Sequence, residues 1–544
     1  MDLGKDSEHI GTDNTRVSPN IMFLAKLQAD LLSKMSKEVH MQDIQSKDKP
    51  GGTVRLLTKK NVTLGAIVVL LIVGIIAAVV SLLTLGQDRD KKLQNQDCPN
   101  VLSPGMSYPA VGKTGIQGRQ FLVCFTENHP NARNQNKTIY ILSDEEFEFV
   151  LISKFLDSPQ LNTEVKTQSI NFNKEINVIN TIALSSFQVE QKALLIETTE
   201  DVSVIIIDNY IHTSDSTTIL PLKSLSNSYI ISTAKAKSTI VKSSQFAIAS
   251  PQNGTIIRIK FHFDPDSPII INDTTYRNGS EMTLVLDELQ TYQIQHWADM
   301  SGTVINATSP LAVFAGSNCK IIPFINSTEA QSCGKLDEQI PPIDRLDKMY
   351  IVPPNFNRNG TFLKIVSPFE NRLTYKIGNK QTEKTLNPSG YLEIYFLNDE
   401  VVVIDSEKSV LVTSFATGSY VTGDPYMITV PGIRQYTDKY LVEIPENYKE
   451  SYICLMVEEK SLHNLVLNGT EIIQFLNDTK FNATLTIRDI NFVVLILQVS
   501  GGMLDIKSSN TAAFGLVVYG HRQEDGHGFA GKAVLPDICV HSYE

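Results

Sequence analysis

The feature of the sequence that most constrains its fold is an uncharged apolar run of 24 residues, Val62 to Leu85. At about 1.5 Å of rise per residue, a helix of this length crosses a hydrocarbon core of about 30 Å. A buried soluble helix is the alternative, but such helices seldom run this far without a polar face. A cleavable signal peptide fits poorly, because the run is long and has no clear small-residue cleavage site. The sequence therefore predicts one transmembrane helix at 62–85.

Three features around this segment predict its orientation. Five basic residues lie between Lys47 and Lys60, against three just after the segment, which is a modest positive-inside bias. Cysteines and N-glycosylation sequons after the segment indicate an oxidising, extracellular side. The cysteines, all of which follow the segment, are Cys98, Cys124, Cys319, Cys333, Cys454 and Cys539. The ten sequons after it begin at Asn136, Asn253, Asn272, Asn278, Asn306, Asn326, Asn359, Asn468, Asn477 and Asn482. We expect a single-pass type II protein of the plasma membrane with an extracellular C-terminal domain.

Residues 1–60 are then a cytoplasmic tail, and residues 86–100 are a polar stalk. Within the tail, Ser18 can cap a short amphipathic helix whose apolar stripe includes Leu24 and Leu31. A helix with such a stripe can lie on the inner leaflet of the membrane or pair with a partner helix. The sequence supports equally well the alternative that the tail is only weakly helical.

Beyond the stalk, apolar residues alternate with period 2 instead of 3.6. Thr255–Phe263, Met282–Leu289 and Tyr391–Phe396 are examples of this pattern, which is typical of half-buried strands. The segment DKMYIVP at Asp347–Pro353 recurs as DKYLVEIP at Asp438–Pro445, which indicates internal repetition. We predict an all-β ectodomain of tandem β-sandwich-like units. The predicted divisions are a first β region at 101–224, sandwich units at 225–345 and 346–436, and a last unit with a C-terminal tail at 437–544.

The sequence contains no motif that would make the chain an enzyme or a cofactor binder. A net charge of -11 without a basic block argues against nucleic-acid binding. His521 and His527 come nearest to a metal cluster, but their spacing fits no zinc motif. The single tryptophan, Trp297, is best explained as a core residue. We therefore predict no catalytic residue, no metal and no cofactor.

Six segments in sequence order resemble the N-terminal domain of the IgG Fc-binding protein family. They are GRQFLVCFTENH (Gly118–His129), ALLIETTEDVSVI (Ala193–Ile205), SPLAVFAGSNC (Ser309–Cys319), CGKLDEQIPP (Cys333–Pro342), GDPYMITVPGIRQY (Gly423–Tyr436) and YGHR (Tyr519–Arg522). The resemblance implies a β-rich extracellular binding or adhesion module, and it implies that Cys319 pairs with Cys333. The remaining cysteines allow three connectivities, of which Cys98 with Cys124 and Cys454 with Cys539 is a guess. Immunoglobulin binding maps onto no residue of this chain.

These observations predict a non-enzymatic cell-surface protein for adhesion or recognition. Its partner would be an extracellular glycoprotein, mucus component or glycan. The sequence is compatible with a homo-oligomer as well as with a monomer. The alternative is an ectoenzyme such as a glycan-acting hydrolase, which needs two carboxylates brought together from distant strands. A signalling receptor ranks lowest, because the tail contains no tyrosine.

Overall fold

The computed structural model describes residues 117–129, 136–155, 170–209, 213–234, 244–322, 333–418, 423–448, 450–522 and 525–531. All of them belong to one compact unit, Asp97–Glu544. The predicted tail, transmembrane helix and stalk lie outside the described residues, as do Cys98, Asn326 and Cys539. Within the described ranges, no helix is long and apolar enough to cross a membrane.

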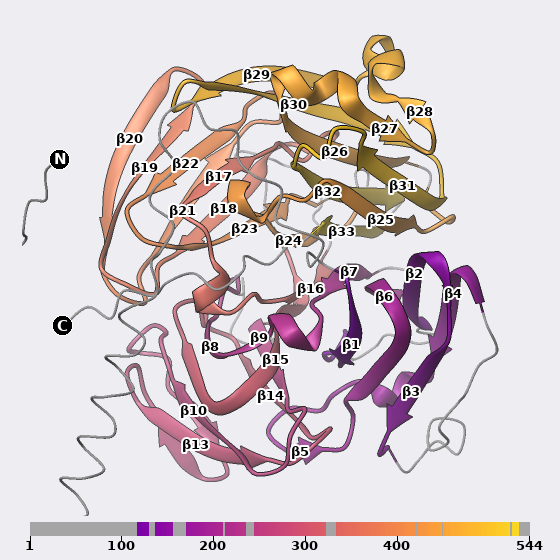
Figure 1. The fold of residues 1–544 in the computed structure, drawn as a ribbon. Helices are drawn as coiled ribbons and strands as arrows, with labels where there is room; N and C mark the ends of the chain where they lie inside the picture. Colours follow the sequence, from indigo (N-terminus) through magenta and orange to yellow (C-terminus); the bar gives the residue numbers. More distant parts are fainter. Residues whose placement is uncertain are drawn as a thin grey trace, which may run out of the picture. The chain divides into compact units, whose positions relative to one another are not determined.

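The described strands fall into four successive sets (Figure 1). The first set contains β1 (Gly118–Val123), β2 (Asn136–Phe147), β3 (Phe149–Ser153), β4 (Ile170–Val178), β5 (Val189–Glu190), β6 (Leu194–Asn209) and β7 (Asp215–Ile219). The second contains β8 (Ser226–Ile230), β9 (Ser244–Ala249), β10 (Thr255–Lys260), β11 (Ile269–Ile271), β12 (Thr274–Tyr276), β13 (Glu281–Leu286), β14 (Thr291–His296), β15 (Val304–Lys320) and β16 (Gly334–Gln339).

The third and fourth sets come next along the chain. The third contains β17 (Met349–Val352), β18 (Thr361–Val366), β19 (Asn371–Ile377), β20 (Lys380–Leu386), β21 (Tyr391–Phe396), β22 (Val402–Ser406), β23 (Leu411–Ala416) and β24 (Met427–Thr429). The fourth contains β25 (Lys439–Ile444), β26 (Glu450–Glu458), β27 (Leu465–Leu467), β28 (Thr470–Glu471), β29 (Phe481–Ile487), β30 (Ile490–Val499), β31 (Gly502–Ser508), β32 (Phe514–Arg522) and β33 (Asp525–Gly531). The 3-10 helices are η1 (Asn180–Ile182), η2 (Leu222–Ser224), η3 (Ile343–Arg345), η4 (Ile433–Gln435), η5 (Glu459–Asn464) and η6 (Ile472–Asp478).

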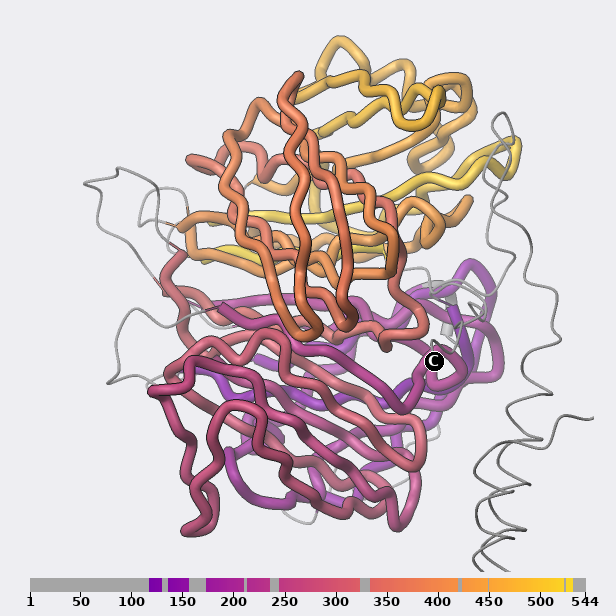
Figure 2. The backbone as a smooth tube through the Cα atoms, turned by 90° about the vertical axis from the view of Figure 1, so that its left-hand side faces the viewer, coloured from indigo at the N-terminus to yellow at the C-terminus, as the bar shows by residue number. Residues whose placement is uncertain are grey.

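One antiparallel pairing scheme recurs in all four sets. The third set forms the sheets β17-β22-β19-β20 and β21-β18-β23-β24. In Figure 2, orange strands of this set run side by side. The fourth forms β25-β31-β27-β28 and β30-β26-β32-β33, with β29 added beside β30. In the first and second sets, the long strands β6 and β15 each supply one segment to both sheets. The prediction of a mostly β fold with several antiparallel sheets is confirmed, whereas the predicted domain boundaries stay predictions.

Apolar residues from both sheets of a set share one core. In the third set, Tyr350 and Ile404 from one sheet pack in the same cluster as Leu363 and Val412 from the other. The alternation predicted for Thr255–Phe263 holds over β10, where every second side chain is buried. A period of 2 therefore places one face of each strand against the core.

Related connectors join one set to the next. They read PLKSLSNSYI (Pro221–Ile230), PIDRLDKMYI (Pro342–Ile351) and GIRQYTDKYL (Gly432–Leu441), and each begins with a 3-10 helix. The tyrosine near the end of each connector is buried, and its hydroxyl donates to a backbone carbonyl of the same set. These bonds run from Tyr229 to Leu311, from Tyr350 to Val410 and from Tyr440 to Phe514. Tyrosines that bond back to the backbone also stabilise corners in other β-sandwiches.

Replacing Tyr350 with phenylalanine should lower the free energy of unfolding by about 2 kcal/mol, because a buried carbonyl and a buried N–H both lose their partner. The hydroxyl donates to Val410 O at 2.6 Å and accepts the N–H of Asp347 at 2.9 Å. Chemical denaturation of residues 97–544 measures the change, and the half-buried Tyr375 gives a matched Tyr→Phe control. Equal effects at the two positions would contradict the role of the hydroxyl.

The last strand of each set lies at the centre of the described structure (Figure 1). Contacts run from β7 to β16, from β16 to β24, from β24 to β33 and from β33 back to β7. The four sets therefore meet in a closed cycle, and the chain joins three of the four junctions with a connector. The junction between the fourth set and the first is held by noncovalent contacts among the described residues.

Candidate functional site

The carboxylate of Asp215 lies where the four central strands meet. It accepts the backbone N–H groups of Ser216 and Asp337 at 2.9 Å each, and those of Met427 and Gly528 at 3.2 Å each. These donors belong to β7, β16, β24 and β33, so each set contributes one. The first three each lie five residues before the first residue of the following connector. One buried side chain thus satisfies equivalent backbone donors from all four sets.

Burial dominates the electrostatics of Asp215, whose exposed fraction is 1%. It raises the pKa of the carboxyl well above its ordinary value, while the backbone N–H groups act in the opposite direction because they stabilise the ionised form. No substrate can reach a group this deeply buried. Asp215 is therefore a residue that holds the architecture together.

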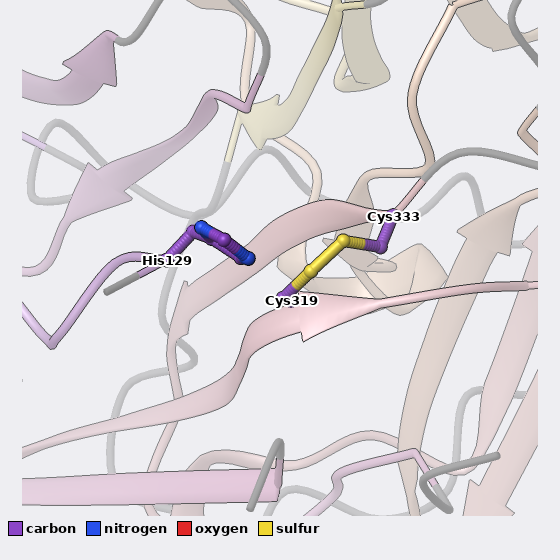
Figure 3. A group of neighbouring side chains, drawn as sticks. All are labelled: His129, Cys319 and Cys333. Carbon is purple, nitrogen blue, oxygen red and sulfur yellow. A yellow bond between two sulfur atoms is a disulfide. The ribbon is translucent and has the colours of Figure 1, made fainter. Parts of the chain in front are cut away.

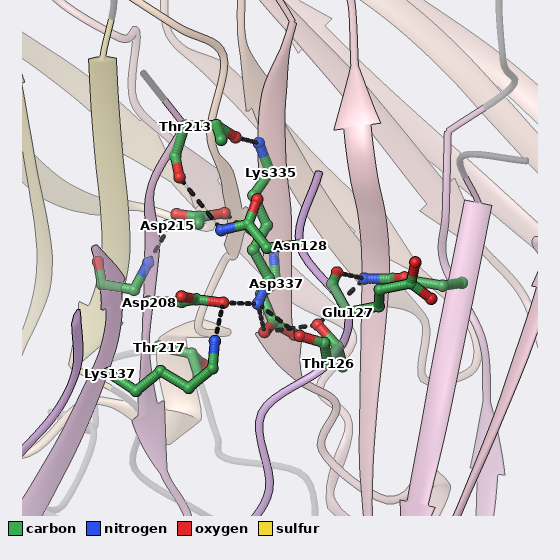
Figure 4. Close-up of polar contacts among 12 residues, drawn as sticks. Thr126, Glu127, Asn128, Lys137, Asp208, Thr213, Asp215, Thr217, Lys335 and Asp337 are labelled. Carbon is green, nitrogen blue, oxygen red and sulfur yellow. Dashed lines mark hydrogen bonds and ion pairs between the residues drawn. The ribbon is translucent and has the colours of Figure 1, made fainter. Parts of the chain in front are cut away.

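A cluster of four charges lies beside Asp215, between the first and second sets (Figure 4). The ammonium of Lys335 lies 2.5 Å from Asp208 and 3.0 Å from Asp337, and Lys137 lies 2.8 Å from Asp208. Both lysine side chains are 0% exposed. Thr126 joins the cluster by donating its hydroxyl to Asp337 at 2.8 Å. Two positive and two negative charges balance, as buried ions require.

The two lysines shift the pKa of Asp208 to about 2, because their attraction outweighs the effect of burial. The pKa of Lys335 is raised by Asp208 and Asp337, although burial alone would lower it. Sequence reasoning identified TEN at Thr126–Asn128 and KLDEQ at Lys335–Gln339 only as family-like segments. Lys137 directly before the apolar run of β2 and Asp208 directly after the apolar run of β6 were the available signal for a buried ion cluster.

The pair Cys319–Cys333, which the resemblance implied, forms a disulfide with a Cα–Cα distance of 5.2 Å. His129 lies beside it, and the three potential ligand atoms are within 4.8 Å of one another (Figure 3). Partial burial lowers the pKa of His129. Both sulfurs are bonded to each other, so neither is the thiolate that a metal ion would bind. The cluster is a cross-link with a neighbouring imidazole.

Cys124 and Cys454 are free thiols among the described residues. Cys98 and Cys539, their guessed partners, lie outside the described residues, so these two pairings stay predictions. Both free thiols lie inside apolar cores with an exposed fraction of 0%. Burial raises the pKa of each thiol above its ordinary value, which makes both thiols poor nucleophiles.

The remaining candidate residues do not come together as an active site. His527 is buried with Nδ1 3.1 Å from Ser216 Oγ, and burial lowers its pKa to about 3. His521 instead lies 3.3 Å from Glu450, and burial lowers its pKa to about 4. Trp297 is half-buried against the core of the second set. These two histidines are therefore packing residues of the central strands and their neighbours.

Nine of the ten predicted sequon asparagines are described, and all nine are exposed. They are Asn136, Asn253, Asn272, Asn278, Asn306, Asn359, Asn468, Asn477 and Asn482. Exposure is required of a side chain that carries a glycan. Their occupancy stays a prediction.

The junction between the fourth set and the first also includes β25, which contacts β2 and β6. It contains a carboxyl group with a shifted pKa. Glu443 accepts a hydrogen bond from Asn173 at 2.9 Å and has an exposed fraction of 8%. Burial raises its pKa to about 7, and the charges of Glu175 and Glu446 add to the effect. Lys439 pairs with Asp144 at the same junction.

Replacing Glu443 with glutamine should stabilise the protein at pH 8 and have little effect at pH 4. A folded-state pKa above the ordinary value of 4.5 means that ionisation of Glu443 costs stability as the pH rises from about 4.5 through 7. We expect a gain of about 1 to 2 kcal/mol at pH 8, below the full shift because solvent screens part of it. Denaturation at both pH values tests this, with the exposed Glu471 as control. The same change at both pH values would contradict it.

Comparison with known proteins identifies the family. The family model described as IgGFc binding protein matches residues 215–520, from Asp215 to β32. The IgGFc-binding protein of Homo sapiens is 22% identical over 381 residues, which is 67% of this chain and 7% of that protein. The chain therefore spans only a small part of the length of this relative, and the activity of the whole relative does not transfer to it.

Two solved structures show a weak likeness. One is described as a Ca2+-stabilized adhesin that helps an Antarctic bacterium bind ice; it is 9% identical, with 77% of this chain and 99% of that chain covered, at a TM-score of 0.10. The other concerns host cell surface retention of a 1.5-MDa bacterial ice-binding adhesin; it is 10% identical, with 58% and 98% covered, at a TM-score of 0.09. Such TM-scores support no argument about fold or function. Because the family match covers more than half of its residues, the chain belongs to the IgGFc-binding protein family.

Proposed function

We propose that this chain is a non-enzymatic adhesion or recognition protein of the cell surface, anchored as a single-pass type II protein. This proposal rests on the place where the family-like segments meet, which is the meeting point of β7, β16, β24 and β33 and is here called the central junction. Thr126, Lys335 and Asp337 belong to these segments, and all three are buried at the central junction. The features shared with the family therefore stabilise an architecture and leave its outer loops free to bind partners.

The topology is supported by the sequence: an uncharged run at 62–85, cysteines only after it, and exposed asparagines at nine sequons. The partner would be an extracellular protein or glycan. A glycan-acting hydrolase is less well supported, because Asp208 and Asp215, two carboxyl groups with shifted pKa values, are buried at the junction and cannot flank a sugar ring.

The test is a binding screen with the secreted, glycosylated unit 97–544 against immunoglobulins, mucins, glycan arrays and microbial surfaces. Saturable binding that persists after enzymatic deglycosylation would support recognition by the protein surface. Failure to bind in a sample shown to be folded would count against it. Turnover of a glycan substrate that one point mutation abolishes would overturn it in favour of an ectoenzyme.

A further inference from the structure

Strand β29 lengthens one sheet of the fourth set by a strand of seven residues. In the second set, the two-residue strand β5 takes the corresponding place beside β14. Strand β29 pairs with β30 along Phe481–Ile487, and it forms the outer edge of a five-stranded sheet (Figure 1). In the third set, the strand equivalent to β30 is β21, and β21 is itself the edge strand of its sheet. Among the described residues, no strand pairs with the outer side of β29.

The sequence of this edge favours pairing with another strand. FNATLTI contains no charge, no proline and no glycine, and it is rich in β-branched and apolar residues. Phe481 and Leu485 pack partly against the core, whereas Asn482, Thr484 and Thr486 are exposed. An open, uncharged edge of this kind is a template for pairing with a second copy of the chain.

The edge of another sheet is protected in a different way. Strand β20 carries Lys380, Glu383 and Lys384 on its exposed positions, so edge pairing there would bring charges together. Strand β29 has no such charges, but Asn482-Ala483-Thr484 is a sequon, and both of its functional side chains face solvent. Of the three sequons in the fourth set, this one lies on the edge strand itself.

We propose that an N-linked glycan on Asn482 covers the outer edge of β29 and prevents it from pairing with a second copy. In the transfer, Asn482 Nδ2 bonds to C1 of an oligosaccharide and loses one proton. The C1–O bond to the pyrophosphate of the lipid carrier breaks, and the pyrophosphate leaves with the electron pair. This inference rests on the extracellular location in the proposed function, because the lipid-linked donor acts on that side of the membrane.

The test uses three substitutions at Thr484 in the full-length chain, purified in detergent from glycosylating cells. Thr484→Ser keeps the sequon, Thr484→Val removes it without adding charge, and Thr484→Lys removes it and adds a charge to the edge. Mass spectrometry gives the occupancy of Asn482, and light scattering gives the mass of the particle. We expect wild type, Thr484→Ser and Thr484→Lys to be monomeric and Thr484→Val to double in mass as its concentration rises.

Two results would overturn this inference and leave the proposed function standing. One is an unoccupied Asn482 in a chain whose other sequons are occupied, and the other is a Thr484→Val variant that is as monomeric as wild type. A chain with no occupied sequon would overturn the proposed extracellular location as well. Asn482→Gln provides a second variant without the glycan, and it should behave like Thr484→Val.

Discussion

Replacing Asp215 with asparagine is expected to lower the free energy of unfolding by about 4 kcal/mol. The carboxylate accepts four backbone N–H groups with its two oxygens. An asparagine side chain keeps one oxygen and turns an NH₂ group toward the other two donors. Each buried donor left without an acceptor costs about 1 to 3 kcal/mol, so two of them give the expected loss.

The same substitution should also weaken the coupling between the strand sets. Because the donors come from β7, β16, β24 and β33, their common acceptor links regions that are far apart in the sequence. We expect unfolding of residues 97–544 to become less cooperative, so that fluorescence and circular dichroism no longer report a single transition.

A matched control is Asp399→Asn, which makes the same chemical change at an exposed position. It should change the stability by no more than about 0.5 kcal/mol. A loss below about 1 kcal/mol for Asp215→Asn, with coincident transitions, would show that the central carboxylate is dispensable.

Local patterns in the sequence were sufficient to predict the strands that have one buried face. The period-2 alternation of Thr255–Phe263 corresponds to β10, and the repeated segments at Asp347 and Asp438 correspond to β17 and β25. These signals are local because a strand with one buried face must alternate. The repeat was visible because equivalent connectors need equivalent tyrosines and apolar residues.

The central junction could not be predicted in this way. Strand β7 reads DSTTI, a polar segment that is typical of a surface strand, yet all five residues are buried. Its polar groups are satisfied by strands from the other three sets, 121 to 313 residues away in sequence. Nothing in the local pattern encodes these partners. The buried lysines escaped prediction for the same reason, since lysine is seldom fully buried unless it is paired.

The second large effect is expected at Asp208, which bridges the two buried lysines. Replacing Asp208 with asparagine leaves Lys137 and Lys335 with Asp337 as the remaining carboxylate of the four-charge cluster. An uncompensated charge in this position should cost about 3 to 5 kcal/mol. The surface pair Arg488–Asp405 offers a control, because Asp405→Asn at an exposed ion pair should cost at most about 1 kcal/mol.

The pH dependence gives an independent measure of the same group. The folded-state pKa of Asp208, about 2, lies below its ordinary value of 3.8, so ionised Asp208 stabilises the fold above pH 3.8 and this contribution is lost as the pH falls toward 2. The contribution amounts to about 2 kcal/mol. Between pH 5 and pH 2, the Asp208→Asn protein should therefore lose about that much less stability than the wild type.

A double substitution separates the loss of attraction from the cost of an unpaired charge. Lys137→Met combined with Asp208→Asn leaves Lys335 and Asp337 as a balanced pair, 3.0 Å apart. If charge balance governs this cluster, the double variant should be more stable than the sum of the single effects predicts, by about 1 to 3 kcal/mol. Additivity within about 0.5 kcal/mol would mean that the two positions act independently, and the cluster would then stabilise the junction through packing and hydrogen bonds alone.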